Sequence, residues 1–140
     1  GYRTVPVNKS TIGPSALSVE PIMEQVFLKK PDSITDPEDF ERKLFVLKNY
    51  ASHTINNSIK KEAIGFYMAS LSQRVIVYKG QLTSHQVREY FPDLSNKRVV
   101  SAFGLVHSRF ATNTFPSWKL AQPFRYIAHN GEINTIFGFN

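Results

Sequence analysis

The chain has 140 residues and a formal net charge of +6, a length that fits one domain or part of one. Hydrophobic residues make up 41% of it and aromatic residues 13%, which supports a packed core and argues against disorder. No apolar run approaches the roughly 20 residues that span a bilayer. With no Cys, the sequence also excludes disulfides, thiolate metal sites and a thiol nucleophile within these residues.

The basic residues are spread along the chain in short groups such as Lys29-Lys30 and Lys60-Lys61. We interpret them as a solvated surface, so no nucleic-acid partner is expected. The histidines lack the spacing of metal ligands, and no metal site is predicted. The first residues lack the apolar core of a secretory signal, so we expect a cytoplasmic protein without a membrane partner.

The first half of the chain predicts an arm, a strand and a helix. Residues 1–19 are polar and contain Pro and Gly, which is typical of an extended arm or loop. Residues 22–28 are apolar enough for a strand. Asp36 and Pro37 are favoured at a helix start. The apolar residues that follow recur at helical spacing: Phe40, Leu44, Leu47 and Ala51. This pattern predicts an amphipathic helix with one face on a core.

The second half predicts a hairpin and a short helix. Residues 64–71 and 75–78 are rich in β-forming residues, and a turn at 72–74 would join them. Thr83 and Gln86 match a capping box for a helix that Pro92 ends.

Two further strands are predicted at 101–110 and 124–128. A loop at 111–123 separates them. Trp118 and most Phe residues are expected in the core, although Phe115 and Trp118 of this loop could line a pocket. A helix could begin after Gly131.

Arg109 closes the first of these strands and could form a bidentate pair with a substrate carboxylate. A structural ion pair is the alternative reading. His107 and Ser108 do not form a base–nucleophile pair, because adjacent residues of a strand point to opposite faces.

Asn130-Gly131 in the stretch His129-Asn130-Gly131-Glu132 has two readings. A side-chain amide and a backbone N–H aimed at one point can bind the oxyanion of an acyl-transfer intermediate. Asn-Gly is also common in tight type I′ hairpin turns. A helix after Gly131, rather than a strand, would favour the oxyanion hole.

Taken together, these segments resemble the glutamine amidotransferase domain of glutamate synthase large chains. The resemblance is carried most strongly by residues 106–118, 121–123 and 129–135, and less specifically by 2–8, 20–21, 24–27, 40–44 and 78–80. It covers essentially the whole chain.

The resemblance implies an α+β fold, as part of a four-layer αββα N-terminal-nucleophile hydrolase sandwich with antiparallel sheets. It implies a domain that hydrolyses L-glutamine and releases ammonia for glutamate formation from 2-oxoglutarate. It assigns Arg109 to the glutamine α-carboxylate, Thr112 to the wall of the substrate site, and Asn130 and Gly131 to the oxyanion hole. FMN and an iron–sulfur cluster are implied for the full-length protein, and no cofactor for this chain.

The sequence also departs from that family. The nucleophile of that family is an N-terminal Cys, whereas residue 1 of this sequence is Gly and the sequence contains no Cys. We therefore expect residues 1–140 to be a partial domain, lacking the nucleophile segment and the C-terminal remainder, and inactive alone. The carboxylate that binds the glutamine ammonium group is expected beyond Asn140.

Other interpretations stay open at this point. The chain could be a non-catalytic module that binds glutamine or regulates a partner, or part of another class II amidotransferase. The 115–118 stretch favours glutamate synthase. A partial sandwich would expose core faces and sheet edges, so self-association is expected besides pairing with the rest of the parent polypeptide.

Overall fold

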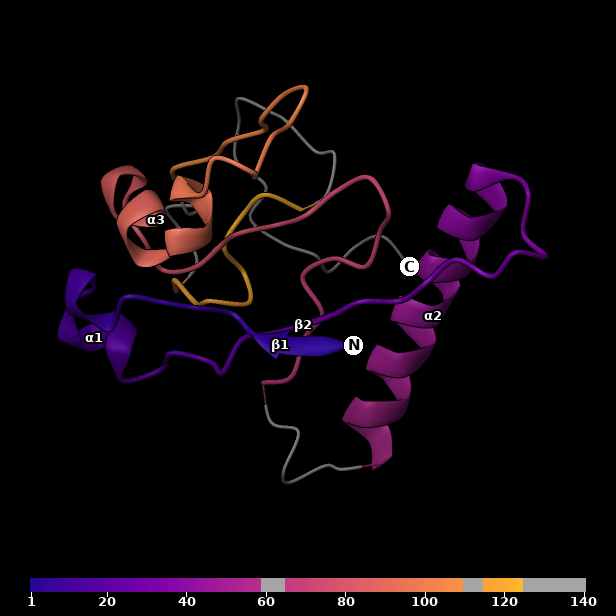
Figure 1. The fold of residues 1–140 in the computed structure, drawn as a ribbon. Helices are drawn as coiled ribbons and strands as arrows, with labels where there is room; N and C mark the ends of the chain where they lie inside the picture. The colour runs from indigo at the N-terminus through magenta and orange to yellow at the C-terminus, as the bar shows by residue number, and fades with distance from the viewer. Residues whose placement is uncertain (59–64, 110–114, 125–140) are drawn as a thin grey trace. The chain divides into compact units, whose positions relative to one another are not determined.

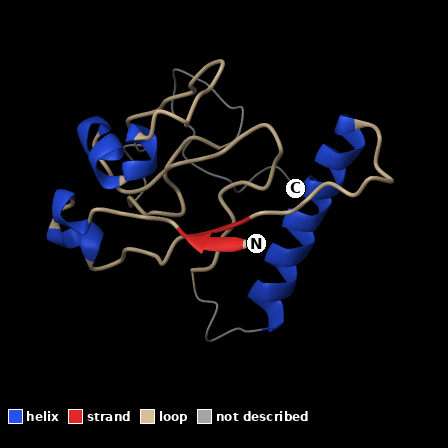
Figure 2. Ribbon diagram, viewed as in Figure 1, coloured by secondary structure: helices blue, strands red, loops and turns tan. Residues whose placement is uncertain are grey.

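The computed structural model describes residues 1–58, 65–109 and 115–124 (Figure 1). Its regular elements are β1 (Tyr2–Thr4), the 3-10 helix η1 (Lys9–Thr11), α1 (Pro14–Leu17), β2 (Glu24–Val26), α2 (Pro37–Ser58), α3 (Ser84–Tyr90) and the 3-10 helix η2 (Pro92–Ser95). Loops and turns make up the other described residues (Figure 2). Two compact units are present: Gly1 with Val26–Val77, and Tyr2–Gln25 with the described residues from Tyr78 onward.

The long helix α2 confirms the helix predicted from Asp36. The Asp36 carboxylate accepts the Glu38 backbone N–H at 2.9 Å, which satisfies one donor that the first helical turn leaves free. Phe40 and Leu44 are buried, as their helical spacing predicted, but Leu47 is 44% exposed, so the predicted core face does not extend to it. Glu41, however, is buried as well, only 7% exposed, although a charged residue was expected on the outer face.

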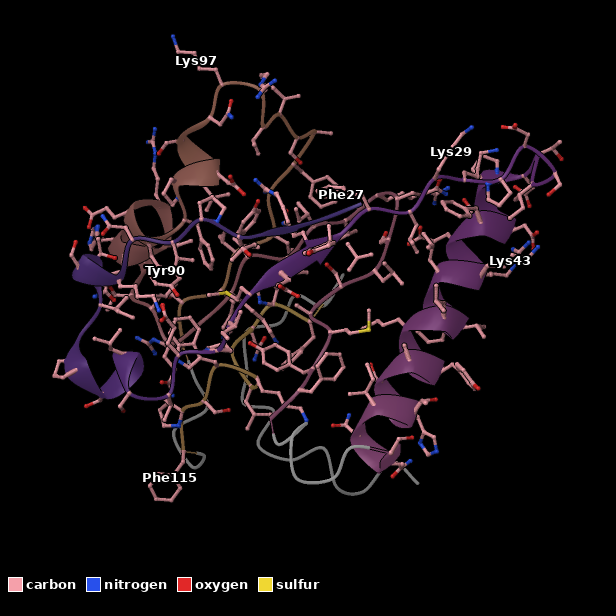
Figure 3. All side chains as sticks on the ribbon, turned by 60° about the horizontal axis from the view of Figure 1, so that its bottom comes forward. Phe27, Lys29, Lys43, Tyr90, Lys97 and Phe115 are labelled. Atoms are coloured by element: carbon pink, nitrogen blue, oxygen red, sulfur yellow. The ribbon has the colours of Figure 1, made fainter. Side chains whose placement is uncertain are left out.

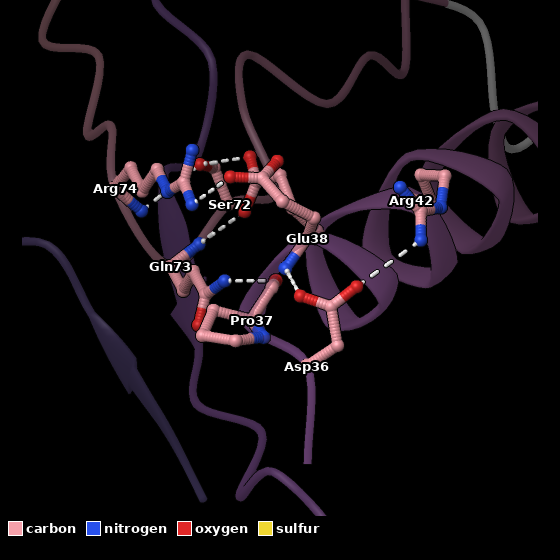
Figure 4. A network of polar contacts seen from close by, with 8 residues as sticks. Asp36, Pro37, Glu38, Arg42, Ser72, Gln73 and Arg74 are labelled. Carbon is pink, nitrogen blue, oxygen red and sulfur yellow. Dashed lines mark hydrogen bonds and ion pairs between the residues drawn. The ribbon is translucent and has the colours of Figure 1, made fainter. Parts of the chain in front are cut away.

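The buried Glu41 explains why the predicted hairpin at 64–78 is wrong. Its carboxylate accepts the Ser72 hydroxyl at 2.5 Å and the Gln73 backbone N–H at 3.1 Å. Gln73 also donates to the Pro37 carbonyl, and Arg74 pairs with Glu38 (Figure 4). Residues 65–78 contain no strand, and the polar groups of 72–74 bond to the first turns of α2.

The expected arm at residues 1–19 contains a strand and two short helical turns. Gly1 and Phe27 exchange backbone hydrogen bonds at 2.7 and 3.0 Å, and the Val5 N–H donates to the Met23 carbonyl at 2.9 Å. The partner moves backward along the chain as the residue number rises, so β1 and β2 are antiparallel. β2 confirms the strand expected within 22–28. Asn8 caps η1 by accepting the Ser10 N–H.

The short helix α3 confirms the capping-box prediction and supplies the core of the second unit. The Gln86 side chain accepts the Thr83 backbone N–H at 2.9 Å. Tyr90 and Phe91, at the end of α3, are 0% and 1% exposed and meet edge to face with ring centroids 4.7 Å apart. Val5 and Trp118 complete this core.

Part of the expected fold class is absent from the described residues. Residues 101–109 contain no strand, which corrects the strand expected at 101–110. The strand predicted at 124–128 and the helix after Gly131 lie almost entirely outside the described residues. Helices and antiparallel strands are both present, but the sheet seen in the described parts has two strands, so the four-layer sandwich remains a prediction.

Candidate functional site

The structure locates one of the four predicted site residues. Arg109 is exposed, in a segment without regular secondary structure that also contains the half-buried His107. Thr112, Asn130 and Gly131 lie outside the described residues. The grouping of the four side chains in one pocket is therefore still a prediction.

The described residues nearest to these positions in sequence are 115–124, between Thr112 and Asn130. Within them Trp118 is 3% exposed, and its indole N–H donates to the Ala16 carbonyl at 3.0 Å. Its ring lies 5.5 Å from that of Tyr90. Trp118 is thus an anchor of the core, which confirms the core interpretation of this residue over the pocket wall. Phe115, by contrast, is 94% exposed and projects away from the chain (Figure 3).

Residues 117–121 form a tight turn around this anchor. The Ala121 N–H donates to the Ser117 carbonyl at 3.1 Å, and the Leu120 N–H donates to the Ser117 hydroxyl at 3.2 Å. Ala121 is buried, 3% exposed. These bonds pair the backbone N–H of the buried Ala121 within the turn, as buried donors require.

Gly80 fits against the face of the Trp118 ring. A Cβ at position 80 would lie 2.3 and 2.6 Å from two ring carbons, far inside the usual carbon–carbon contact distance. Glycine is therefore required here by close approach, because its backbone can meet the indole directly.

Lys79, the residue before Gly80, contacts the same loop. It is only 8% exposed, and its ammonium group donates to the Lys119 carbonyl at 2.7 Å. The same group lies 4.7 Å from the centre of the Phe124 ring, within the range of a cation–π interaction. Lys79 and Gly80 together thus contact the loop at three residues: Trp118, Lys119 and Phe124.

Two ion-pair networks brace the unit that contains this loop. Arg3 pairs with Asp93, which also accepts the Tyr78 hydroxyl at 2.9 Å. The Arg3 guanidinium holds the pKa of the Asp93 carboxyl below its usual value, against an opposing effect of burial. Burial raises the pKa of Tyr78, and its bond to Asp93 adds to the rise.

The second network joins Glu20 to Lys9 and to the buried Tyr90, whose hydroxyl donates to the Glu20 carboxylate at 2.5 Å. Burial alone would raise the pKa of Glu20, but hydrogen bonds from Lys9 and Tyr90 outweigh it and the pKa is lowered. Both carboxylates are therefore held in the charged form by their partners.

The described segments offer no metal site and no membrane span. Within residues 1–58, 65–109 and 115–124, no three His, Cys, Asp or Glu side chains could hold a metal ion together. None of the helices in these segments is both long and apolar enough to cross a membrane. A shallow hollow runs along α2, lined by Asp39, Arg42, Lys43, Val46, Leu47 and Tyr50.

Sequence reasoning missed the role of Lys79 and Gly80, which directly follow the strand predicted at 75–78. One signal was present: a Lys that follows the run Ile76-Val77-Tyr78 has an apolar setting in which a charge needs a partner. The partner itself lies 40 residues away in the chain, and no local pattern could identify it.

Comparison with known protein families identifies relatives of this sequence. The profile for glutamine amidotransferases class-II matches residues 1–140. The chain is 50% identical over 138 residues to the glutamate synthase [NADPH] large chain of Bacillus subtilis, and 52% over 142 residues to the glutamate synthase [NADH] of Schizosaccharomyces pombe. It is 42% identical over 140 residues to the ferredoxin-dependent glutamate synthase 2, chloroplastic, of Arabidopsis thaliana.

These alignments cover 98–99% of this chain but only 6–9% of the length of the relatives. The similarity thus spans one short part of much longer proteins. The relatives differ in the electron donor that their names give, while their identity to this chain varies only from 42 to 52%.

Proposed function

Because the chain belongs to the class II glutamine amidotransferases, we propose that it forms part of the glutaminase domain of a glutamate synthase. In this proposal the complete domain hydrolyses L-glutamine, and the ammonia released is used to form glutamate from 2-oxoglutarate. The observation that carries the proposal is the family match over residues 1–140. Relatives that are named glutamate synthases and match nearly the whole chain support it.

Arg109 is proposed to bind the glutamine α-carboxylate. Its guanidinium can donate two parallel hydrogen bonds to a carboxylate, which fixes orientation as well as charge. Its exposed position in the described structure is compatible with reaching a ligand. Thr112 is proposed to form part of the wall that orients the bound substrate.

Asn130 and Gly131 are proposed to form the oxyanion hole. When a nucleophile attacks the glutamine amide carbon, the carbonyl oxygen acquires negative charge. The Asn130 side-chain amide and the Gly131 backbone N–H would stabilise that charge by donating hydrogen bonds to it. Loss of one such donor typically lowers turnover by about 10²–10³-fold.

The attacking thiol must come from outside these 140 residues, which contain no Cys. We therefore propose that the chain alone is inactive as a glutaminase and needs the rest of the parent polypeptide. An iron–sulfur cluster is held by Cys thiolates, so these residues do not fit one. We propose that the cluster and the FMN of the parent protein both lie in its other parts.

A hybrid large chain tests the proposal. Residues 1–140 would replace the matching segment of the bacterial relative that is 50% identical to them. We expect the hybrid to form glutamate from 2-oxoglutarate with glutamine as the nitrogen donor. Arg109→Gln should raise the KM for glutamine at least tenfold, through the loss of a bidentate ionic contact. Arg98→Gln, at another exposed arginine of the same unit, should leave it unchanged.

A hybrid that forms glutamate from added ammonia but never from glutamine would contradict the proposal. The rival is a module that binds glutamine without catalysis, and the missing Cys is the observation that favours it. Calorimetry on the 140-residue chain separates the two: micromolar glutamine affinity of the chain alone would support the binding module.

The predicted self-association has support in α2, where Val46 and Tyr50 are 64% and 70% exposed. Exposed apolar side chains on one helix face are a common basis of association. We expect the elution volume of the 140-residue chain to decrease as its concentration rises. A constant monomeric elution volume would contradict the self-association. Recovery of the protein in a membrane fraction would contradict the expected cytoplasmic location.

A further inference from the structure

The loop at 115–124 connects the two parts of the proposed glutamine site. Residues 110–114 separate it from Arg109, and residues 125–129 separate it from Asn130. Each connection is short: a chain of this length spans at most about 20 Å when fully extended. The position of this loop therefore limits where both Arg109 and Asn130 can lie.

Lys79 attaches to the loop at two points. Its ammonium group donates to the Lys119 carbonyl at 2.7 Å and lies 4.7 Å from the centre of the Phe124 ring. A lysine that is only 8% exposed is costly to bury. Such a residue is retained only where its contacts compensate for the lost hydration, and here those contacts lead to the loop.

Gly80 secures the middle of the same loop. Its backbone lies against the Trp118 ring so closely that a Cβ would overlap two ring carbons. The Trp118 indole N–H is in turn bonded to the Ala16 carbonyl at 3.0 Å. The loop is thus held at two places by consecutive residues. Gly80 contacts Trp118, and Lys79 contacts Lys119 and Phe124.

We propose that Lys79 is a positioning residue for glutamine binding, which it supports by holding the 115–124 loop between Arg109 and Asn130. This inference rests on the proposed function. Lys79 itself touches the loop and is not placed at the reacting atoms. Its loss would loosen one end of the loop while Trp118 still anchors the other, so the pocket would persist with less fixed walls.

The test uses the hybrid large chain with Lys79→Met, which removes the donor and the charge while keeping an unbranched side chain. We expect the KM for glutamine to rise by up to about tenfold, because glutamine binding would then have to order the loop that one charge-assisted hydrogen bond now holds. Glutamate formation from added ammonia should change less than twofold, since that reaction bypasses the glutamine pocket. Lys79→Arg keeps the charge and donors and should recover part of the loss.

Lys97→Met is the matched control, because Lys97 is exposed in the same unit and projects outward (Figure 3). It should leave the KM for glutamine unchanged. A second readout uses the single Trp of the 140-residue chain: acrylamide should quench Trp118 fluorescence more strongly in the Lys79→Met chain than in the unchanged chain.

The outcomes are distinct. An unchanged KM for glutamine in Lys79→Met, or an equal rise in Lys97→Met, would overturn the positioning role. So would a parallel fall of the ammonia-dependent rate, which would indicate a general loss of structure. If the unsubstituted hybrid uses ammonia but never glutamine, the proposed function fails first and this inference fails with it.

Discussion

The contact between Gly80 and Trp118 predicts a large cost for the smallest possible substitution, Gly80→Ala. The added Cβ would lie 2.3 and 2.6 Å from two carbons of the Trp118 ring. Carbon atoms pack at about 3.5–4.0 Å, so the ring or the backbone must move by about 1 Å. Trp118 is 3% exposed and has little space into which to retreat.

The magnitude follows from three terms. Overpacking a filled core costs about 1–3 kcal/mol. If the ring moves, its hydrogen bond to Ala16 is weakened, which adds about 1 kcal/mol. Replacing Gly by Ala restricts the unfolded chain and returns about 0.4–1 kcal/mol. We therefore expect Gly80→Ala to lower the free energy of unfolding by about 2 kcal/mol.

Urea unfolding followed by fluorescence measures this directly, because Trp118 is the only Trp in the chain. Gly104→Ala is the matched control, since a Cβ at Gly104 would meet nothing within 4 Å. It should leave the free energy of unfolding unchanged or raise it by up to about 1 kcal/mol. If Gly80→Ala is as mild as Gly104→Ala, then Gly80 does not fix Trp118 and the loop is not held as described.

Three further substitutions test other parts of the structure by urea unfolding. Glu41→Ala should lower the free energy of unfolding by about 2–4 kcal/mol, because it leaves the Ser72 hydroxyl and Gln73 N–H without their charged acceptor. A decrease below about 0.5 kcal/mol would show that these bonds form no stable contact. Gly65→Ala should lower the free energy of unfolding by about 1 kcal/mol or more, since Gly65 has a φ of +86°, where a Cβ is strained. An unchanged free energy of unfolding would contradict that conformation. The pKa of Asp93 is lowered in the folded state, so its contribution should be complete above about pH 4 and disappear as the pH falls further. Asp93→Asn should flatten this acid dependence, and an unaltered pH profile would refute the role of the ion pair.

The sequence predicted best what depends on neighbouring residues. Helix α2 follows from Asp36 at its start and from apolar residues at helical spacing, and α3 from the Thr83–Gln86 pair. Both signals act within one or two turns of helix. The turns near Asn8 and Pro14 also had local signals, but their polar composition was interpreted as an arm.

The errors arise where distant residues decide the structure. Residues 72–74 bond to Glu41 and the start of α2, and this long-range pairing replaces the hairpin that their neighbours favoured. Trp118 had two interpretations from the sequence, a core residue or a pocket wall, and its contacts with the distant Tyr90 and Ala16 place it in the core. At the site, Arg109 could be singled out from the sequence alone. The contacts that hold the adjacent loop could not, because Lys79 and Lys119 lie 40 residues apart.

The central claim is that these residues supply the oxyanion-binding part of a glutaminase. Its most direct test is the turnover of glutamine by the hybrid large chain carrying Asn130→Ala, with ammonia-dependent glutamate formation measured in parallel. We predict that kcat for glutamine falls by about 10²–10³-fold while the KM and the ammonia-dependent rate stay nearly constant. Glutamine turnover that is unaffected by Asn130→Ala would contradict the claim.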